Sequence, residues 1–467
     1  MLGCHNDIHP ALAMKERALP GRRHTGRNDT MNRLFQLFRR LAGICLIVMS
    51  TGASADDAAR QRAIELLDYL DAGRYSEATA MFTPRLVEAL PAGRLHVFWA
   101  SLPALYGQPL RRGRPVDEEF LSGYKVRIGL EFEQAMLVAE ITINSQQQIG
   151  SFMLLPDDSP APLVKNARFA ETAFDVPLQR GSLPATLTRP NGPGPFPGVV
   201  LVHGSGPHDR DESIGPNRPF RDLAHGLAAR GIAVLRYEKR SRVRPGDYAG
   251  DFSVDDETTD DAVAALQLLA GTPGIGPVFI FGHSQGGMLA PRIARRAGIA
   301  AGAILWAAPA RPVGSALIEQ LGRIAAMDGN TSADEQKTID QIAQGLARIR
   351  QGDNPPRAEA PLQLPATYWR SLDDILAVDE AKQAKIPLLI LHGGRDYQVT
   401  DTDWQTWRDA FADDPRATLK RYSALNHLGI AGSGRSTPDE YLSSGQVDAG
   451  LIEDSASWIM KIVAERK

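Results

Sequence analysis

The sequence predicts an α/β fold, in which a mostly parallel sheet carries helices on both faces and follows a small α+β domain. Two observations predict it. Beyond residue 198, short runs made only of apolar residues alternate with helical segments, which is typical of buried parallel strands and their connecting helices. Before residue 156, helical segments come first and alternating, strand-like segments follow, which is typical of an α+β domain.

Length and composition exclude several classes of protein. The 467 residues exceed one ordinary domain and suit two or three. Lys and Arg (52) nearly balance Asp and Glu (55), so the chain lacks the basic excess of a general nucleic-acid binder. Hydrophobic residues are 43% and charged residues 23%, which excludes a largely disordered chain. Two cysteines are too few for a disulfide scaffold or a four-cysteine zinc site.

The N-terminus has the pattern of a secretory signal peptide. The apolar run Leu41–Met49 is shorter than the roughly 20 residues that span a bilayer. Arg39 and Arg40 precede this run, and Ala53-Ser54-Ala55 follows it as an A-x-A cleavage site. We therefore expect residues 1–55 to be a signal peptide with an upstream extension, and the protein to be exported to the periplasm or the medium.

Removal of this segment changes the composition of the chain. The remaining residues hold 44 Lys and Arg against 52 Asp and Glu, a net charge of −8. Cys4 and Cys45 both lie in the removed part, which excludes a catalytic thiol or a disulfide and suits an oxidising compartment. Bulky Ile44 precedes Cys45 where a lipoprotein signal needs a small residue, so we expect no membrane anchor after cleavage. Either Met1 or Met31 can serve as the start of the chain.

Residues 56–155 form the predicted small domain. A 3.6-residue apolar rhythm predicts its first helix, and alternation of apolar and polar residues predicts its strands. We expect helices over 59–70, 75–82 and 84–90 and strands over 124–130, 136–143 and 148–155. No His, Asp or Cys cluster marks a site here, so we interpret the domain as a packing or dimerisation module.

A proline-rich segment predicts a linker over 156–169, and the α/β domain then extends over 170–467. We expect its strands over 174–179, 185–189, 199–202, 232–236, 278–281, 303–306, 386–391 and 418–422. We expect its helices over 220–230, 258–270, 286–296, 404–411 and 455–463. Residues 310–385 are too many for a plain loop, so we predict a helical cap over one end of the sheet, with Tyr368 and Trp369 in its core or facing a pocket.

One motif indicates nucleophilic chemistry. Gly282-His283-Ser284-Gln285-Gly286 matches G-x-S-x-G and stands between an apolar strand and an Ala-rich helix. This strand–turn–helix context is the one that a nucleophile elbow requires. The glycines are needed because the turn is tight and neighbouring backbone lies close to it. The motif predicts Ser284 as the nucleophile.

A serine hydroxyl needs a general base, and the base needs an acid to orient it. Seven histidines follow residue 55, and His427 is the one that comes after a suitable acid, as the chain order serine, acid, histidine requires. Asp396 follows the apolar strand over 386–391 through two glycines, so we predict it as the acid. Asp401 and Asp403 are rivals, and capping of the next helix explains Asp401.

The loop after the first buried strand predicts the oxyanion hole. His203-Gly204-Ser205-Gly206 follows the strand over 199–202, and its glycines allow close approach of backbone. We expect the backbone N–H groups of Ser205 and Gln285 to bind the oxyanion.

The same loop region contains residues that could be argued as metal ligands, namely His203, His208, Asp209 and Asp211. Their spacing fits no standard zinc site, and pairing of the carboxylates with Arg210, Arg218 or Arg221 explains them better. We therefore expect no metal ion and no cofactor.

Five segments together resemble the α/β-hydrolase superfamily, most closely a bacterial esterase branch related to dienelactone hydrolases and prolyl-oligopeptidase-type serine hydrolases. They are HGSGPHDRDE (203–212), GIAVLRYEKR (231–240), GHSQGG (282–287), HGGRDYQV (392–399) and NHL (426–428). The resemblance covers about residues 170–465 and implies an α/β-hydrolase fold with Ser284, Asp396 and His427 as the triad. Members of this branch often have the sequence Tyr-Asp-Lys-Arg where this chain has Tyr237-Glu238-Lys239-Arg240. The order of elements in the small domain resembles nuclear-transport-factor-2-like domains that precede some exported hydrolases.

These observations predict a serine hydrolase that cleaves small-molecule carboxylic esters through an acyl-enzyme. A peptidase, a thioesterase and a lactonase share the same chemistry and stay open as alternatives. A peptidase of the related branch would anchor the substrate amine with carboxylates near the pocket. The acidic cluster over 209–212 could do that, but we expect these residues, Glu212 included, to pair with arginines instead. An alternative from another class is a non-catalytic binding protein, in which the small domain is the functional part.

Overall fold

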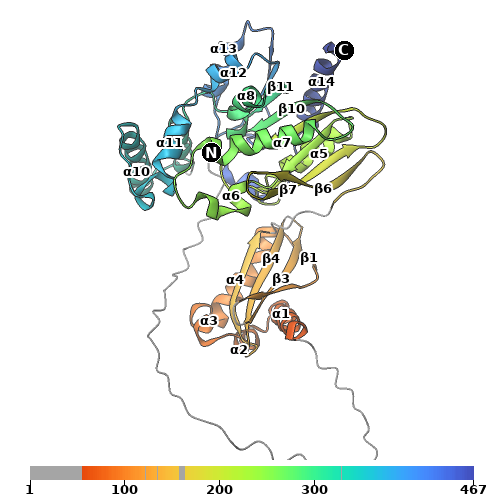
Figure 1. The fold of residues 1–467 in the computed structure, drawn as a ribbon. Helices are drawn as coiled ribbons and strands as arrows, with labels where there is room; N and C mark the ends of the chain where they lie inside the picture. The colour runs from red at the N-terminus through yellow and green to blue at the C-terminus, as the bar shows by residue number, and fades with distance from the viewer. Residues whose placement is uncertain (1–54, 121–122, 134, 157–162, 328, 467) are drawn as a thin grey trace, which may run out of the picture.

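The computed structural model describes residues 55–120, 123–133, 135–156, 163–327 and 329–466. The predicted signal peptide, apart from Ala55, and both cysteines lie outside the described residues. Two sheets organise the described chain, and each has a hydrophobic core of its own (Figure 1). Among the described residues, no helix combines the length and apolar character that a membrane crossing requires.

The first sheet belongs to the N-terminal part of the chain. Its helices are α1 (Ala55–Asp71), α2 (Tyr75–Ala80), α3 (Pro84–Ala89) and α4 (Ala92–Tyr106). Its antiparallel strands are β1 (Pro109–Arg112), β2 (Val116–Phe120), β3 (Gly123–Phe132), β4 (Met136–Asn144) and β5 (Ile149–Pro156). Apolar residues of α1 and of one face of β3 and β4 form its core. The helices come before the strands in the chain, so the order that the sequence predicts is confirmed.

Three elements of this part escape the sequence prediction. Helix α4 contains Pro103 in its interior, a residue that ordinarily ends a helix, so its pattern does not read as helical. Strands β1 and β2 are short and rich in charged residues, and they lie beside β3. Such strands form because a neighbouring strand offers unpaired backbone groups, which the local sequence does not reveal. The domain boundaries stay a prediction.

The second sheet has eight strands in the order β13-β12-β11-β10-β8-β9-β7-β6. Their bounds are β6 (Phe169–Pro177), β7 (Ser182–Pro190), β8 (Phe196–Val202), β9 (Ala233–Tyr237), β10 (Ile275–His283), β11 (Ala300–Trp306), β12 (Leu388–Gly393) and β13 (Ala417–Tyr422). Strands β8 to β13 pair in parallel, whereas β6 and β7 form an antiparallel hairpin at one edge. The mostly parallel sheet is therefore confirmed.

Helices cover both faces of this sheet, as expected for buried parallel strands. One face carries α7 (Asp260–Ala270), α8 (Gln285–Ala297) and α12 (Ala377–Ala384), and the other carries α5 (Pro219–Ala228) and α14 (Ala449–Glu465). A separate apolar cluster fills each side: Ile280 and Leu289 belong to the first, Phe281 and Ile459 to the second. Neighbouring residues of β10 thus point to opposite faces, and the strand is buried on both.

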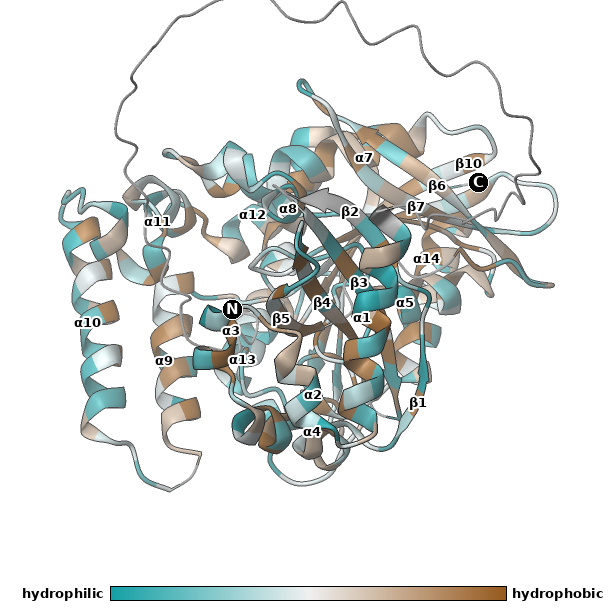
Figure 2. Ribbon diagram, turned by 90° about the horizontal axis from the view of Figure 1, so that it is seen from below, coloured by the Kyte–Doolittle hydropathy of each residue, from teal (hydrophilic) through white to brown (hydrophobic). Residues whose placement is uncertain are grey.

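The predicted cap region is helical. Between β11 and β12 the chain forms α9 (Val313–Ala325), α10 (Ala333–Arg350), α11 (Ala366–Asp373) and α12. Helices α9 and α10 lie side by side, and hydrophilic residues are frequent along α10 (Figure 2). Ser332 and Glu335 form a reciprocal capping box at the start of α10, which fixes where the helix begins.

The junction of β10 and α8 is the tightest part of the sheet. A methyl group on Gly286 would lie 2.2 Å from the carbonyl oxygen of Val202, and one on Gly282 would lie 2.1 Å from that of Gly286. Backbone atoms cannot move aside as a flexible side chain can, so both positions require glycine.

Gly286→Ala should therefore lower the free energy of unfolding by about 2 kcal/mol or more, because overpacking against backbone forces the strands apart. Gly322→Ala is the matched control, since Gly322 lies in α9 with no atom within 4 Å of its added methyl group. That change should be neutral or stabilising by up to about 1 kcal/mol. Denaturant unfolding of both variants measures the difference, and equal stabilities would contradict the close packing of the turn.

Candidate active site

Ser284 occupies a strained turn between β10 and α8. Its backbone angles are φ 52° and ψ −119°, a conformation that non-glycine residues rarely adopt. The backbone N–H of Ser284 donates a hydrogen bond to the carbonyl of Trp306 at 2.9 Å, which ties the turn to the end of β11. Strain of this kind persists only where the surrounding structure enforces it, and it is the conformation that a nucleophile elbow requires.

Asp396 and His427 meet beyond the ends of β12 and β13. Asp396 Oδ2 lies 2.7 Å from His427 Nδ1, and Asp396 Oδ1 accepts hydrogen bonds from the backbone N–H groups of Gln398 and Val399. A carboxylate only accepts, so Nδ1 of His427 carries the proton and Nε2 is the ring nitrogen that can take one up. Both side chains are buried.

Burial and the partner charge act against each other in this pair. Burial alone would raise the pKa of Asp396, but the neighbouring His427 holds that pKa below its ordinary value. Burial lowers the pKa of His427, and the carboxylate of Asp396 offsets only part of that effect. His427 is therefore neutral at pH 7 and able to accept a proton.

The two rival carboxylates have other partners. Asp401 is exposed at the start of α13 (Asp401–Phe411) and forms an ion pair with Arg421 at 2.8 Å. Asp403 pairs with Arg311 at 2.8 Å and accepts a hydrogen bond from the backbone N–H of Ala310. Asp396 alone among the three lies against His427.

The loop that carries His427 rests on the turn that carries Ser284. Nε2 of His283, the residue before Ser284, lies 3.0 Å from the carbonyl oxygen of His427. The two imidazole rings have their centroids 4.7 Å apart. The structure thus ties the loop of the predicted base to the turn of the predicted nucleophile, through the residue that precedes the serine.

The predicted oxyanion residues lie on segments close to Ser284. A methyl group on Gly204 would lie 3.2 Å from Cβ of Ser284, so the loop after β8 passes close to the serine. Gln285 begins α8, where backbone N–H groups have no partner within the helix and the helix dipole favours negative charge. Ser205 and Gln285 both line one cavity.

Charged and polar side chains hold the predicted oxyanion loop at its backbone groups. Lys239 Nζ donates to the carbonyl oxygen of Gly204 at 2.7 Å, and Nε2 of His208 lies 2.7 Å from the carbonyl oxygen of Ser205. Glu212 Oε1 accepts a hydrogen bond from the backbone N–H of Gly204 at 2.6 Å. A loop held at successive backbone groups presents its remaining N–H groups in a fixed direction.

Glu212 also binds the turn of the nucleophile. Its Oε2 lies 2.9 Å from Nδ1 of His283, and the side chain is fully buried. Burial would raise the pKa of Glu212, but His283 outweighs it and lowers that pKa to about 2. Burial would lower the pKa of His283, but Glu212 outweighs it and raises that pKa above its ordinary value. Nε2 of His283 faces a carbonyl, which cannot donate, so both ring nitrogens donate and the pair is an imidazolium and a carboxylate.

This pair is not predicted from the sequence, from which we expected Glu212 to pair with an arginine. That assignment was wrong because no arginine reaches the fully buried carboxylate, whose described partners are Gly204 and His283. The available signal was the position of both residues: Glu212 ends the segment over 203–212, and His283 lies in the elbow. Two charged residues in segments that must meet at one edge of the sheet are candidates for pairing.

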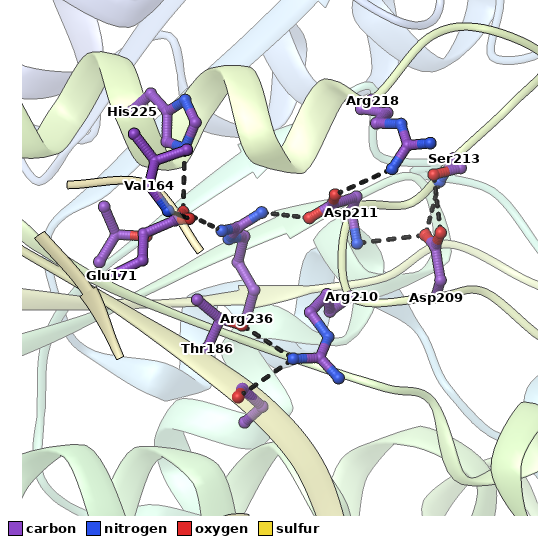
Figure 3. A network of polar contacts seen from close by, with 12 residues as sticks. Val164, Glu171, Thr186, Asp209, Arg210, Asp211, Ser213, Arg218, His225 and Arg236 are labelled. Carbon is purple, nitrogen blue, oxygen red and sulfur yellow. Dashed lines mark hydrogen bonds and ion pairs between the residues drawn. The ribbon is translucent and has the colours of Figure 1, made fainter. Parts of the chain in front are cut away.

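The neighbouring carboxylates do pair with arginines, in part as expected (Figure 3). Asp211 forms ion pairs with Arg236 and with Arg218, and Arg236 also contacts Glu171 of β6. Asp209 instead accepts hydrogen bonds from the backbone N–H and the hydroxyl of Ser213. Within the described part of the chain, no three His, Cys, Asp or Glu side chains gather as a metal site would require.

A cavity of about 620 Å³ lies between the oxyanion loop and the helical insertion. Tyr368 and Trp369 of α11 line it while being buried themselves, so they belong both to the core of the insertion and to the pocket. The hydroxyl of Tyr368 lies 3.1 Å from the side-chain amide of Gln285, which links the insertion to the start of α8. Most other lining side chains are apolar.

Comparison with known proteins identifies the family. The family described as serine aminopeptidase, S33, matches residues 195–430. Esterase EstD of Thermotoga maritima is 32% identical over 402 residues, which cover 86% of this chain and 95% of that protein. The chain belongs to this hydrolase family. It is a serine hydrolase of the α/β-hydrolase fold, and the family resemblance that the sequence predicts is confirmed. A match of 402 residues exceeds the 298 residues from 170 to 467, so the likeness to EstD reaches into the N-terminal part.

Solved structures show more distant likeness. Est1E from Butyrivibrio proteoclasticus is 19% identical with a TM-score of 0.41, and the match covers 62% of this chain and 99% of that one. A proline iminopeptidase from Mycobacterium smegmatis is 17% identical with a TM-score of 0.41, covering 63% and 100%. Likeness at this level does not bear on the substrate.

Glu212→Gln should destabilise the protein most strongly at mildly acidic pH. The folded pKa of Glu212, about 2, lies below its ordinary 4.5, so its contribution is present above pH 4.5 and is lost as pH falls toward 2. The folded pKa of His283 lies above its ordinary 6.5, so its contribution is present below pH 6.5 and is lost as pH rises through the folded value. Between these limits we expect a loss of about 3 kcal/mol, because one partner of a buried pair is removed.

Unfolding of wild type and variant between pH 4 and pH 9 measures this effect. Glu453→Gln is the control, since Glu453 forms an ion pair with Arg230 at the exposed surface. Its removal should change the stability little at every pH, because water screens an exposed ion pair. A destabilisation by Glu212→Gln that does not change with pH would argue against the ion pair.

Proposed function

We propose that this protein hydrolyses carboxylic esters through an acyl-enzyme formed on Ser284. His427 removes the proton of the Ser284 hydroxyl, and the oxygen attacks the ester carbonyl. The backbone N–H groups of Ser205 and Gln285 stabilise the oxyanion of the tetrahedral intermediate. The alcohol leaves with the proton from His427, and water then attacks the acyl-enzyme by the same route.

Asp396 has a positioning and electrostatic role in this proposal. It keeps the proton of neutral His427 on Nδ1, so that Nε2 faces the reaction, and it stabilises the imidazolium that forms. The observation that carries the proposal is the 2.7 Å contact between Asp396 and His427, on a loop that His283 ties to the turn of Ser284. The strained backbone of Ser284 and the family of the chain support it.

The charges of the cavity favour an ester over a peptide substrate with a free amine. Binding of an ammonium group needs an available carboxylate. Glu257 is the acidic side chain that lines the cavity, and Lys239 Nζ lies 2.6 Å from its carboxylate. Thr258 donates a further hydrogen bond to it at 2.5 Å. With its charge balanced inside the protein, Glu257 offers little to a substrate amine, and EstD, which shares 95% of its length with this chain, is an esterase.

Ser284→Ala should lower kcat for p-nitrophenyl esters by at least about 10³-fold while the protein stays folded, because the nucleophile is lost and the core is untouched. Asp396→Asn should lower kcat by about 10³–10⁴-fold, because the histidine tautomer is no longer enforced. Asp401→Asn is the matched control, and it should keep near wild-type kcat.

Ester hydrolysis, hydrolysis of aminoacyl p-nitroanilides and melting curves are measured for each variant. Hydrolysis of anilides but not esters by wild type would favour a peptidase. Wild-type activity in Ser284→Ala would refute the mechanism, and failure of a fluorophosphonate to label wild type would favour a binding protein.

We also propose that the protein is exported, on the basis of the basic residues, the apolar run Leu41–Met49 and the A-x-A sequence. N-terminal sequencing of the protein recovered from the periplasm or medium should give Asp56 as the first residue. A chain that begins at Met1 or Met31 would contradict export by signal cleavage.

A further inference from the structure

One cationic side chain of the cavity has no oppositely charged partner among the residues that the structure describes. Arg357 lies in the insertion, between α10 and α11, and lines the cavity. Its Nε donates to the carbonyl oxygen of Gln363 at 2.7 Å, and its Nη1 donates to that of Tyr248. In the part of the chain that the structure describes, Arg357 contacts these two carbonyls and the ring of Phe252, whose centroid lies 5.8 Å from the guanidinium carbon.

The other charges at the cavity cancel. Glu257 and Lys239 form a buried pair at 2.6 Å, so together they add no net charge. Two neutral carbonyl groups do not neutralise a guanidinium. The cavity therefore carries one uncompensated positive charge, in a protein whose overall charge is −3.

The guanidinium of Arg357 is held in place and still has donors to offer. A guanidinium has five N–H groups, and the two carbonyl oxygens use only part of them. Both of these partners are backbone atoms of residues that themselves line the cavity, Tyr248 and Gln363. An arginine fixed in this way loses little conformational entropy on binding an anion, and its planar fork matches a carboxylate.

Much of the remaining wall is apolar. Phe252, Leu317, Leu364 and Leu372 line the same cavity, which extends from the predicted oxyanion residues to Arg357 in the insertion. A site with apolar walls and one unpaired cation suits a ligand with an apolar body and one anionic end. A neutral hydrocarbon chain would fill the volume and leave the cation unused.

We propose that Arg357 binds a carboxylate of the substrate, so that the preferred substrates are esters whose apolar acyl chain ends in a second, ionised carboxyl group. This inference rests on the proposed esterase function. The scissile carbonyl lies at Ser205 and Gln285, the acyl chain contacts the leucine side chains, and the distal carboxylate accepts hydrogen bonds from Arg357. The charge selects the substrate by binding it and takes no part in the bonds that form and break.

The test compares matched pairs of esters. One pair is the mono-p-nitrophenyl ester of suberic acid and p-nitrophenyl octanoate, which differ by a carboxylate at the end of the acyl chain. The second pair is 4-carboxyphenyl octanoate and 4-carbamoylphenyl octanoate, which places the charge on the leaving group. The ratio of kcat/KM for the charged and the neutral ester is measured in each pair, for wild type and variants.

Arg357→Gln should lower the ratio of the acyl pair by up to about fivefold, because Arg357 is exposed and water weakens its charge-assisted hydrogen bond. Hydrolysis of p-nitrophenyl octanoate should change little, which shows that the variant is folded and active. Arg357→Lys should recover part of the ratio, because the charge returns without the planar fork. Added salt should lower the wild-type ratio and leave that of Arg357→Gln unchanged.

Arg370→Gln is the matched control. Arg370 lies in α11 of the same insertion, and it too donates to backbone carbonyls, those of Ile349 and Asp353, but it does not line the cavity. Its removal should leave both ratios at the wild-type value.

Three results would overturn the inference. The first is an acyl-pair ratio that is the same in wild type and Arg357→Gln. The second is an equal fall of the ratio in Arg370→Gln, and the third is an effect confined to the leaving-group pair. If any of these results is found and the wild type still hydrolyses p-nitrophenyl octanoate, the inference fails but the proposed esterase function stands. If the wild type hydrolyses no ester, the inference and the proposed esterase function both fail.

Discussion

The ion pair between Glu212 and His283 is the interaction on which the site depends. It joins three loops that are far apart in sequence: Glu212 accepts from the N–H of Gly204 after β8, binds His283 at the end of β10, and through it reaches the carbonyl of His427 after β13. Removing a carboxylate from water is costly unless every acceptor site finds a donor. The donors to Glu212 are the N–H of Gly204 and the ring of His283, which lie next to the predicted oxyanion donor Ser205 and the predicted nucleophile Ser284. The hydrogen bonds that stabilise the buried charge therefore also align these loops.

The parallel sheet explains why Glu212 can join loops that are far apart in sequence. Loops after parallel strands leave from the same edge, so the segments after β8, β10, β12 and β13 gather there although β9, β11 and the insertion separate them in sequence. The turn of Ser284 is strained, and the hydrogen bond to Trp306 together with the close packing at Gly286 holds it. Rigidity at this edge comes from backbone packing and from buried charge together.

The helical insertion supplies what the sheet does not. It closes the cavity over the loops, brings apolar side chains to it and places the single uncompensated cation there. Its link to the sheet is specific, because Tyr368 contacts the side chain of Gln285 at the start of α8. The edge of the sheet thus holds the proposed reactive groups, while the insertion provides the surface that would discriminate among substrates. The proposed reaction and the proposed selection therefore lie in different segments of the chain.

The sequence by itself determined the alternation of buried strands and helices, the turn at Ser284 and the segments that carry Asp396 and His427, because these depend on local periodicity and on glycine. Helix α4, with its internal proline, and the charged strands β1 and β2 were decided by tertiary structure, since neighbouring elements complete them. The partner of Glu212 was decided in the same way. Which charge neutralises which depends on distances across the fold, and sequence separation contains no information on those distances.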